Sequence, residues 1–230
     1  MIHNDTKIMG PDHEFDTTSW TLIRAVGDVN AFDTFVRIYW KPLYFFVRQH
    51  GYDNENAKDI VQDFLTTILE KGSLTKADPA RGRFRTFLLA ALTNFMKDRV
   101  KAAARQKRGG AHSILSLDFA SGEREFVLEV SSGESPETVL NRTWARTLWK
   151  QAITELKGDP AHIEAFTLYL ADTDYDVIAK KTGLTPAAAK MAVHRLKGQL
   201  RDTIQHYILQ TSVDEDELKS EIAEFMALLS

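Results

Sequence analysis

The sequence predicts an all-α protein of two small helical domains, and three observations lead to that prediction. Apolar residues recur at helical spacing in successive segments, which are separated by Gly and Pro breaks. Sustained alternation of apolar and polar residues, which would predict strands, occurs in neither half of the chain. A chain of 230 residues, of which 43% are hydrophobic, is long enough to form two small cores.

The same pattern divides the chain into five segments. We expect a flexible leader over residues 1–17, a first helical domain over 18–108, a linker over 109–138, a second helical domain over 139–210 and an acidic C-terminal helical extension over 211–230. The linker is broken by Gly, Ser and Pro residues, and its few apolar residues allow short extended pieces but no core of their own.

The composition favours a cytoplasmic protein. The chain has no cysteine, which excludes disulfides and thiolate metal sites and indicates a reducing compartment. The first 16 residues lack the apolar core of a signal peptide, and no apolar run approaches the length of a membrane span. The net charge of -3 conceals an asymmetry, because a basic block near the middle of the chain is offset by the acidic C-terminal extension.

Three segments of the first domain have helical periodicity ahead of the basic block. The first starts near Thr18 or Ser19, and the second covers residues 31–49, where Pro42 predicts a kink or a break. After a turn at residues 51–54, the third covers residues 55–71 and has an almost continuous i, i+3, i+4 apolar series. A loop with Gly and Pro residues follows over 72–83.

The first domain is organised around a helix predicted over residues 84–108. Its first half has an apolar face, whereas its second half is basic: residues 81–108 carry nine Lys or Arg against a single acid, Asp98. Acids usually accompany the bases on a solvated helix. We therefore interpret this basic face as a surface for phosphates rather than a solvated helix end. The side chains that align on it are Asn94, Lys97, Lys101, Arg105 and Arg108.

Helical periodicity resumes at Val139 and breaks at Gly158. Asp159 and Pro160 are then typical of an N-cap and the first residue of a new helix. No strand pattern interrupts this part of the chain, which supports a second all-helical domain.

Residues 172–201 predict a helix-turn-helix. Asp174 can cap a short helix that buries residues 177–179, Gly183 ends it in the left-handed conformation, and Thr185 with Pro186 begins a second helix. A short helix, a tight turn and a basic second helix form the geometry that places a recognition helix in the major groove. The alternative is a generic helical hairpin with a lysine-rich face. The side chains expected on the outer face are Lys190, His194, Arg195, Lys197 and Arg201.

Three stretches together resemble the sigma-70 family of RNA polymerase sigma factors, in its extracytoplasmic-function (ECF) type. YWKPLYFFVRQHGYDNENAKDIVQDFLTTIL resembles the first helices of sigma domain two, and FRTFLLAALTNFMKDRVKAAARQKRGG resembles its promoter-melting helix. YDVIAKKTGLTPAAAKMAVHRLKGQLR resembles the helix-turn-helix of sigma domain four. The resemblance covers about residues 18–208 and fits two-domain members that lack domain three.

The resemblance implies a transcription initiation factor with core RNA polymerase and promoter DNA as partners. It places core-polymerase binding at Asp59, Gln62, Asp63 and Phe64. It places binding to the proximal promoter element at Asn94, Lys97, Asp98, Arg99, Lys101, Arg105 and Arg108, and binding to the distal element at Thr185, Lys190, His194, Arg195, Lys197 and Arg201. We also expect an anti-sigma factor or a Ser/Thr kinase as candidate partners, and a monomer when the protein is free.

Two features depart from the family pattern. Lys58 replaces one acid of the pair that usually precedes the D-I-V-Q-D-F segment, and we hypothesise that phosphorylation of Thr66 or Thr67 on the same face restores the negative charge. The acidic helix after about residue 210 is additional to the two-domain plan. It either packs on domain four, which we favour, or covers the basic recognition face as an inhibitor.

Three other functions were weighed against this one. A helix-turn-helix regulator that acts without polymerase would bind duplex DNA tightly as the free protein. An enzyme is not indicated, because the sequence has no phosphate-binding Gly loop, no His cluster at metal-ligand spacing and no nucleophile motif, so we expect no cofactor and no catalytic residue. An adaptor that binds only proteins leaves both basic faces unexplained.

Overall fold

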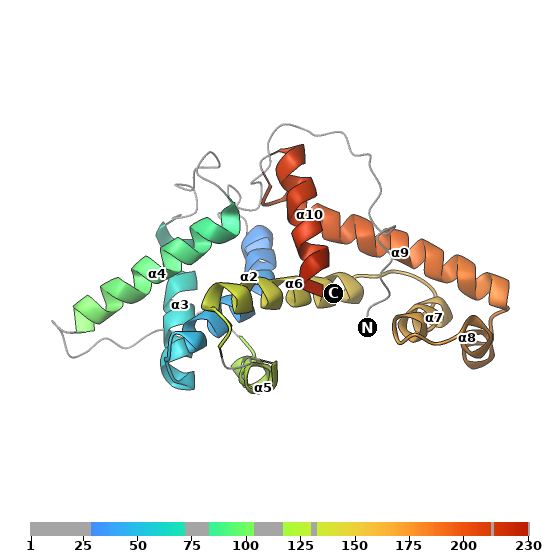
Figure 1. Cartoon of the computed structure of the whole chain (residues 1–230), viewed down its shortest axis with the longest axis horizontal. Coiled ribbons are helices and arrows are strands. Elements are labelled where there is room, and N and C mark those ends of the chain that lie inside the picture. The colour runs from blue at the N-terminus through green and yellow to red at the C-terminus, as the bar shows by residue number, and fades with distance from the viewer. Residues whose placement is uncertain (1–28, 72–82, 104–116, 130–132, 213, 230) are drawn as a thin grey trace.

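The computed structural model describes residues 29–71, 83–103, 117–129, 133–212 and 214–229, and every regular element among them is a helix. The all-α prediction is therefore confirmed for this part of the chain (Figure 1). The leader expected over 1–17, the helix expected from residue 18, and Arg105 and Arg108 lie outside the described residues. The helices are α2 (Val29–Gln49), α3 (Asn54–Lys71), α4 (Phe84–Ala103), α5 (Phe119–Glu129), α6 (Pro136–Thr154), α7 (Pro160–Leu170), α8 (Tyr175–Thr182), α9 (Pro186–Leu209) and α10 (Glu215–Leu229).

Helix α2 is continuous through Pro42, so the break that we considered there does not occur. Proline removes one backbone hydrogen bond from a helix interior. Side chains on both sides of the proline are completely buried, among them Leu43 and Tyr44, which each have 0% exposure. Upstream, Tyr39 lies edge-on to Phe84 of α4 with ring centroids 5.5 Å apart. Burial of these large side chains holds the helix together across the missing bond.

Helix α5 corrects our expectation of extended pieces in the linker. Asp118 caps it by accepting a hydrogen bond from the backbone N–H of Ser121 at 3.0 Å. Phe119 and Phe126 pack edge-on against aromatic rings of α2, with centroids 5.3 Å from those of Trp40 and Phe45. The residues that face α2 are thus helically spaced, and the segment buries its apolar face on α2 rather than in a core of its own.

Helix α6 packs along α2, so the two predicted domains share one hydrophobic cluster. It begins at Pro136, and the side chain of Ser135 accepts a hydrogen bond from the N–H of Thr138 at 3.2 Å. Trp144, which is 2% exposed, lies between α2 and α10, where its ring is edge-on to that of Phe225 at 5.9 Å. The domain boundary that we placed before residue 139 therefore does not correspond to two separate cores, because α2 and α6 pack together.

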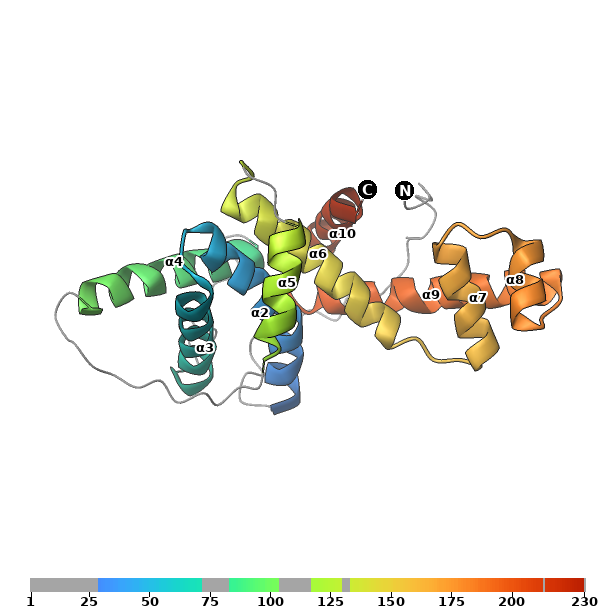
Figure 2. The ribbon, with the colours of Figure 1, turned by 90° about the horizontal axis from the view of Figure 1, so that it is seen from below.

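The molecule is elongated, with α3 and α4 at one end and α7, α8 and the start of α9 at the other (Figures 1 and 2). Helices α2, α6 and α10 lie between these ends. Helix α10 packs against α6 and the C-terminal half of α9. Within the described residues, none of the helices is long and apolar enough to span a membrane.

Candidate nucleic-acid interface

The turn between α8 and α9 forms as the sequence predicts. Gly183 ends α8 with φ of 72°, a left-handed conformation that favours glycine. Thr185 caps α9, because its hydroxyl oxygen accepts a hydrogen bond from the N–H of Ala188 at 3.1 Å. Two details differ from the sequence analysis. The side chain of Asp174 makes no capping hydrogen bond, and Val177, which we expected to be buried, is 42% exposed. The α8–α9 pair nevertheless has the short helix, the turn and the second helix that the sequence analysis expected.

The outer face of α9 carries exposed cations along its first half. Lys190, His194 and Arg195 are exposed, whereas Lys197 and Arg201 are half-buried. The apolar face is as predicted, because Val193, Leu196 and three further side chains pack inward. The residues that the sequence analysis expected to be buried on α9, and that are buried, are Ala189, Val193, Leu196, Leu200 and Ile204.

Two tyrosines that the sequence analysis did not single out hold lysines of α9. The ammonium group of Lys197 donates a hydrogen bond to the hydroxyl of Tyr169 on α7 at 2.7 Å and lies 4.4 Å from the centre of that ring. The Lys190 ammonium lies 5.5 Å from the ring centre of Tyr175 on α8. These contacts fix the two lysines relative to α7 and α8, and the rings reach them because α7 and α8 pack onto α9.

Arg195 and Arg201 also have partners in the free protein. A guanidinium nitrogen of Arg195 lies 2.9 Å from Nδ1 of His162 on α7, which accepts the hydrogen bond when that nitrogen carries no proton. Arg201 pairs with the neighbouring Asp202 at 3.2 Å. Both contacts are at the surface, so a phosphate can replace them at small cost.

The exposed face of α4 carries the second set of predicted DNA-binding residues. Asn94, Lys97, Asp98 and Lys101 are exposed, and Leu92 and Met96 are buried on the opposite face. Lys101 lies 3.7 Å from Asp98, a loose surface pair whose side chains are 70% and 77% exposed. This surface and the start of α9 lie at opposite ends of the molecule (Figures 1 and 2).

Arg99, also predicted to bind DNA, is occupied by α3. Its guanidinium pairs with the carboxylate of Asp63 and lies 3.4 Å from the backbone oxygen of Asp59. Our reading of the basic block as almost unopposed is thus wrong for this arginine, because the opposing acid lies 36 residues away in the sequence.

The surface of α3 is only partly available to a partner. Asp59 is exposed, and Gln62 and Asp63 are half-buried. Phe64 is only 4% exposed, and its ring lies 5.5 Å from that of Phe95 on α4. We had placed Phe64 in the polymerase-binding surface, but its ring belongs to the α3–α4 core.

The two threonines considered for phosphorylation lie on the half-buried side of the same helix. The hydroxyl of Thr67 donates a hydrogen bond to the backbone oxygen of Asp63 at 2.7 Å. Lys58, the basic residue at an expected acidic position, pairs with Glu55 at 2.7 Å, so its charge is already balanced within α3. This pair weakens the argument that a phosphate is needed to restore the charge.

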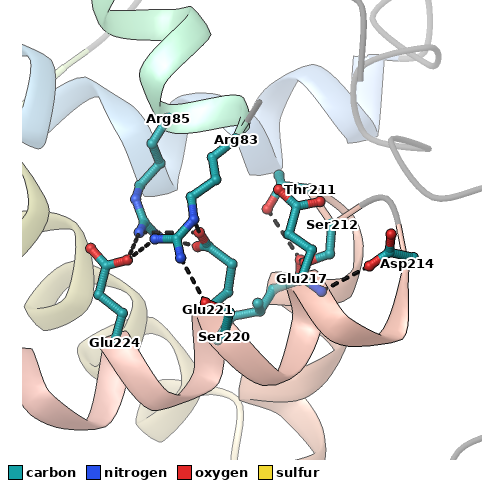
Figure 3. A network of polar contacts seen from close by, with 10 residues as sticks. Arg83, Arg85, Thr211, Ser212, Asp214, Glu217, Ser220, Glu221 and Glu224 are labelled. Carbon is teal, nitrogen blue, oxygen red and sulfur yellow. Dashed lines mark hydrogen bonds and ion pairs between the residues drawn. The ribbon is translucent and has the colours of Figure 1, made fainter. Parts of the chain in front are cut away.

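A buried network joins the start of α4 to α10 (Figure 3). Arg85 and Glu221 are 5% and 4% exposed, and their side chains pair at 2.5 Å. Arg83 lies 3.1 Å from Glu221 and also pairs with Glu224. The Arg85 guanidinium lies 3.8 Å from the ring centre of Trp144. Burial raises the pKa of Glu221, while the charges of Arg85 and Arg83 oppose that rise.

This network corrects one further expectation and agrees with another. Arg83 and Arg85, which we counted among the unopposed bases, are neutralised by the acidic helix. Helix α10 packs on α6 and on the C-terminal half of α9, away from the exposed Lys190, His194 and Arg195. It therefore packs on the second domain, as we favoured, and in addition binds α4.

The described residues contain no group of three or more His, Asp or Glu side chains placed to hold a metal ion.

In a comparison with known protein families, residues 35–106 match the family described as Sigma-70 region 2. No curated protein and no solved structure gives a significant match to the chain. The matched segment contains most of α2, all of α3 and all of α4. The match covers less than half of the chain, and it shows that this segment is similar to sigma-70 region 2.

Proposed function

We propose that this protein is an initiation factor of the ECF type, which binds core RNA polymerase and directs it to specific promoters. Region 2 opens the proximal promoter element, and the α8–α9 helix-turn-helix docks on the distal element. The observation that supports the proposal is the presence, in one chain, of a region 2 match and of a separate pair of helices, α8 and α9, whose second helix carries exposed Lys and Arg side chains. The protein works in the cytoplasm as a binding factor without catalytic activity.

The two DNA surfaces have different tasks. Asn94, Lys97 and Lys101 follow the phosphates of the melted strand, and the exposed amide of Asn94 offers hydrogen bonds to an unstacked base. The start of α9 enters the major groove of duplex DNA, and its cations bind the flanking phosphates. Since these surfaces lie at opposite ends of the molecule, two neighbouring promoter segments can engage it without competing for one site.

Polymerase binds the α3 surface formed by Asp59, Gln62 and Asp63. Two of these side chains are carboxylates, which suit a basic partner surface. Phe64 supports this surface from inside by packing on Phe95.

The test is in vitro transcription with core polymerase, comparing the wild type with Lys97→Ala/Lys101→Ala. The double variant should bind melted promoter DNA more weakly, and the slope of log affinity against log salt should fall by about 1.4, or about 0.7 for each lost phosphate contact. Lys150→Ala/Lys219→Ala is the matched control, because these lysines lie on α6 and α10 with 59% and 62% of their side chains exposed. Transcription that does not depend on the protein would contradict the proposal.

A second candidate is a helix-turn-helix regulator that acts without polymerase. Lys190, His194 and Arg195 are exposed in the free chain, which favours direct duplex binding. The two functions separate in a duplex-binding titration with and without core polymerase. An initiation factor binds promoters tightly only with polymerase, whereas a regulator binds equally well alone.

A further inference from the structure

Met191 is an apolar side chain in the middle of the basic outer face of α9. It is 72% exposed, the most exposed large hydrophobic residue described on that helix. Ala187, one turn closer to the helix start, is exposed as well. Residues four apart lie on the same side of a helix, so Ala187 and Met191 form a short apolar strip.

The surroundings of this strip indicate what it binds. Residues 186–201 contain no acidic residue, and the strip is flanked by the exposed side chains of Lys190, His194 and Arg195. Cations around an apolar centre suit a ligand that carries phosphates at its edges and an apolar group between them. Duplex DNA has this arrangement, because phosphates border the major groove and the 5-methyl group of thymine projects into it.

We propose that Met191 contacts the 5-methyl group of a thymine in the major groove and so contributes to sequence specificity. This inference rests on the proposed DNA-binding function of α8–α9. The unbranched thioether of methionine reaches and adapts to an apolar contact. Ala187 adds only a methyl group, which lets the start of α9 approach the bases closely.

This role differs from that of the neighbouring cations. Lys190 and Arg195 carry positive charges that bind phosphates, so they increase affinity for any duplex and make it depend on salt. Met191 carries no charge and contributes nothing to this salt-dependent binding of phosphates. Its loss should change which sequence is preferred while the salt dependence of binding stays the same.

The experiment starts by selecting preferred sites from a randomised 30-base-pair duplex pool, using the full chain with core polymerase. Each thymine of the selected site is then replaced in turn by deoxyuridine, which lacks only the 5-methyl group. At one thymine the wild type should lose about fourfold in affinity, the value of one buried methyl group. Met191→Ala should bind the thymine and deoxyuridine sites equally, and Met191→Leu should keep most of the difference.

Each other outcome overturns the inference in a different way. If the wild type does not distinguish thymine from deoxyuridine, or if Met191→Ala still does, Met191 does not read a methyl group. If Met191→Ala keeps the site preference but binds core polymerase more weakly, the strip faces a protein instead. If the pool yields no preferred sequence at all, the DNA-reading function proposed for α8–α9 fails, and this inference fails with it.

Discussion

Arg99 on α4 pairs with the carboxylate of Asp63 on α3, and the two side chains are 39% and 33% exposed. Arg99 belongs to the proposed DNA surface, and Asp63 belongs to the proposed polymerase surface. In the free protein, Arg99 and Asp63 therefore occupy each other, so neither side chain is fully available to its proposed partner. If polymerase engages Asp63 as proposed, we expect the Arg99 guanidinium to become free to bind a phosphate.

Asp63→Asn should increase the affinity of the free protein for single-stranded DNA. The substitution removes the acid that occupies Arg99, and an exposed ion pair is worth up to about 1 kcal/mol, which corresponds to a gain of up to about fivefold. Fluorescence anisotropy with a labelled oligonucleotide measures it. Glu70→Gln is the control, because Glu70 is exposed on the same helix and its loss changes net charge equally. An equal gain in both variants would show an effect of net charge alone.

Arg85→Ala should lower the free energy of unfolding by about 3 kcal/mol or more, because it leaves the buried Glu221 without its closest partner. Urea denaturation of the full chain measures this change. Replacing both partners with apolar residues, Arg85→Met/Glu221→Leu, should recover most of the loss, since no buried charge then lacks its partner. Arg37→Ala, in a surface pair on α2, should cost less than about 0.5 kcal/mol. A double variant as unstable as the single one would contradict this account.

Deletion of residues 214–230 should destabilise the protein rather than activate it. Phe225 is completely buried, and removal of a buried phenylalanine side chain alone costs about 3–5 kcal/mol. Denaturation and duplex binding are measured on the same preparation, with Phe225→Ala beside the deletion. A stable deletion variant that binds duplex DNA more tightly would favour the inhibitory role instead.

Acid should weaken the attachment of α5 to α2. Burial alone would raise the pKa of Glu123, but hydrogen bonds from Arg48 and Tyr44 and the charge of Arg48 bring it below its ordinary value of 4.5. A carboxylate with a depressed pKa in the folded state stabilises the fold above its unfolded pKa, and this stability is lost as the pH falls through the folded value. The loss should begin near pH 4.5 and continue below it.

Unfolding free energies measured between pH 7 and pH 3 check this expectation. Glu123→Gln should make the free energy of unfolding fall less steeply as the pH is lowered. Glu215→Gln, which changes an exposed pair with Lys219, should leave this pH dependence nearly unchanged. If Glu123→Gln has the same pH profile as the wild type, Glu123 does not hold α5 in place.

The sequence predicted those parts of the fold that depend on neighbouring residues. Capping by Asp159 and Thr185 and the left-handed Gly183 each rely on residues within one turn, and all three were found from local patterns. Helix α5 was missed because it is short and contains Gly122, which weakens a helical pattern. That glycine allows a close approach of α5 to α2, because a Cβ atom there would lie 3.1 Å from the Trp40 ring.

The candidate surfaces were predicted less completely than the helices that carry them. The partners of Arg85 and Arg99 lie 136 and 36 residues away, so no local pattern could assign them. The contact between Lys197 and Tyr169 likewise depends on how α7 packs on α9. An exposed methionine within a segment free of acids was visible in the sequence, but its 72% exposure became known only from the fold.

The packing of α6 on α2 affects how the protein can be dissected. The matched family segment ends at residue 106, yet Tyr39 within it is 2% exposed and belongs to the same buried cluster as Trp144 of α6. A fragment cut at the end of that segment would leave the aromatic side of α2 in contact with water. Self-association of such a fragment would then report a missing neighbour rather than a natural oligomer.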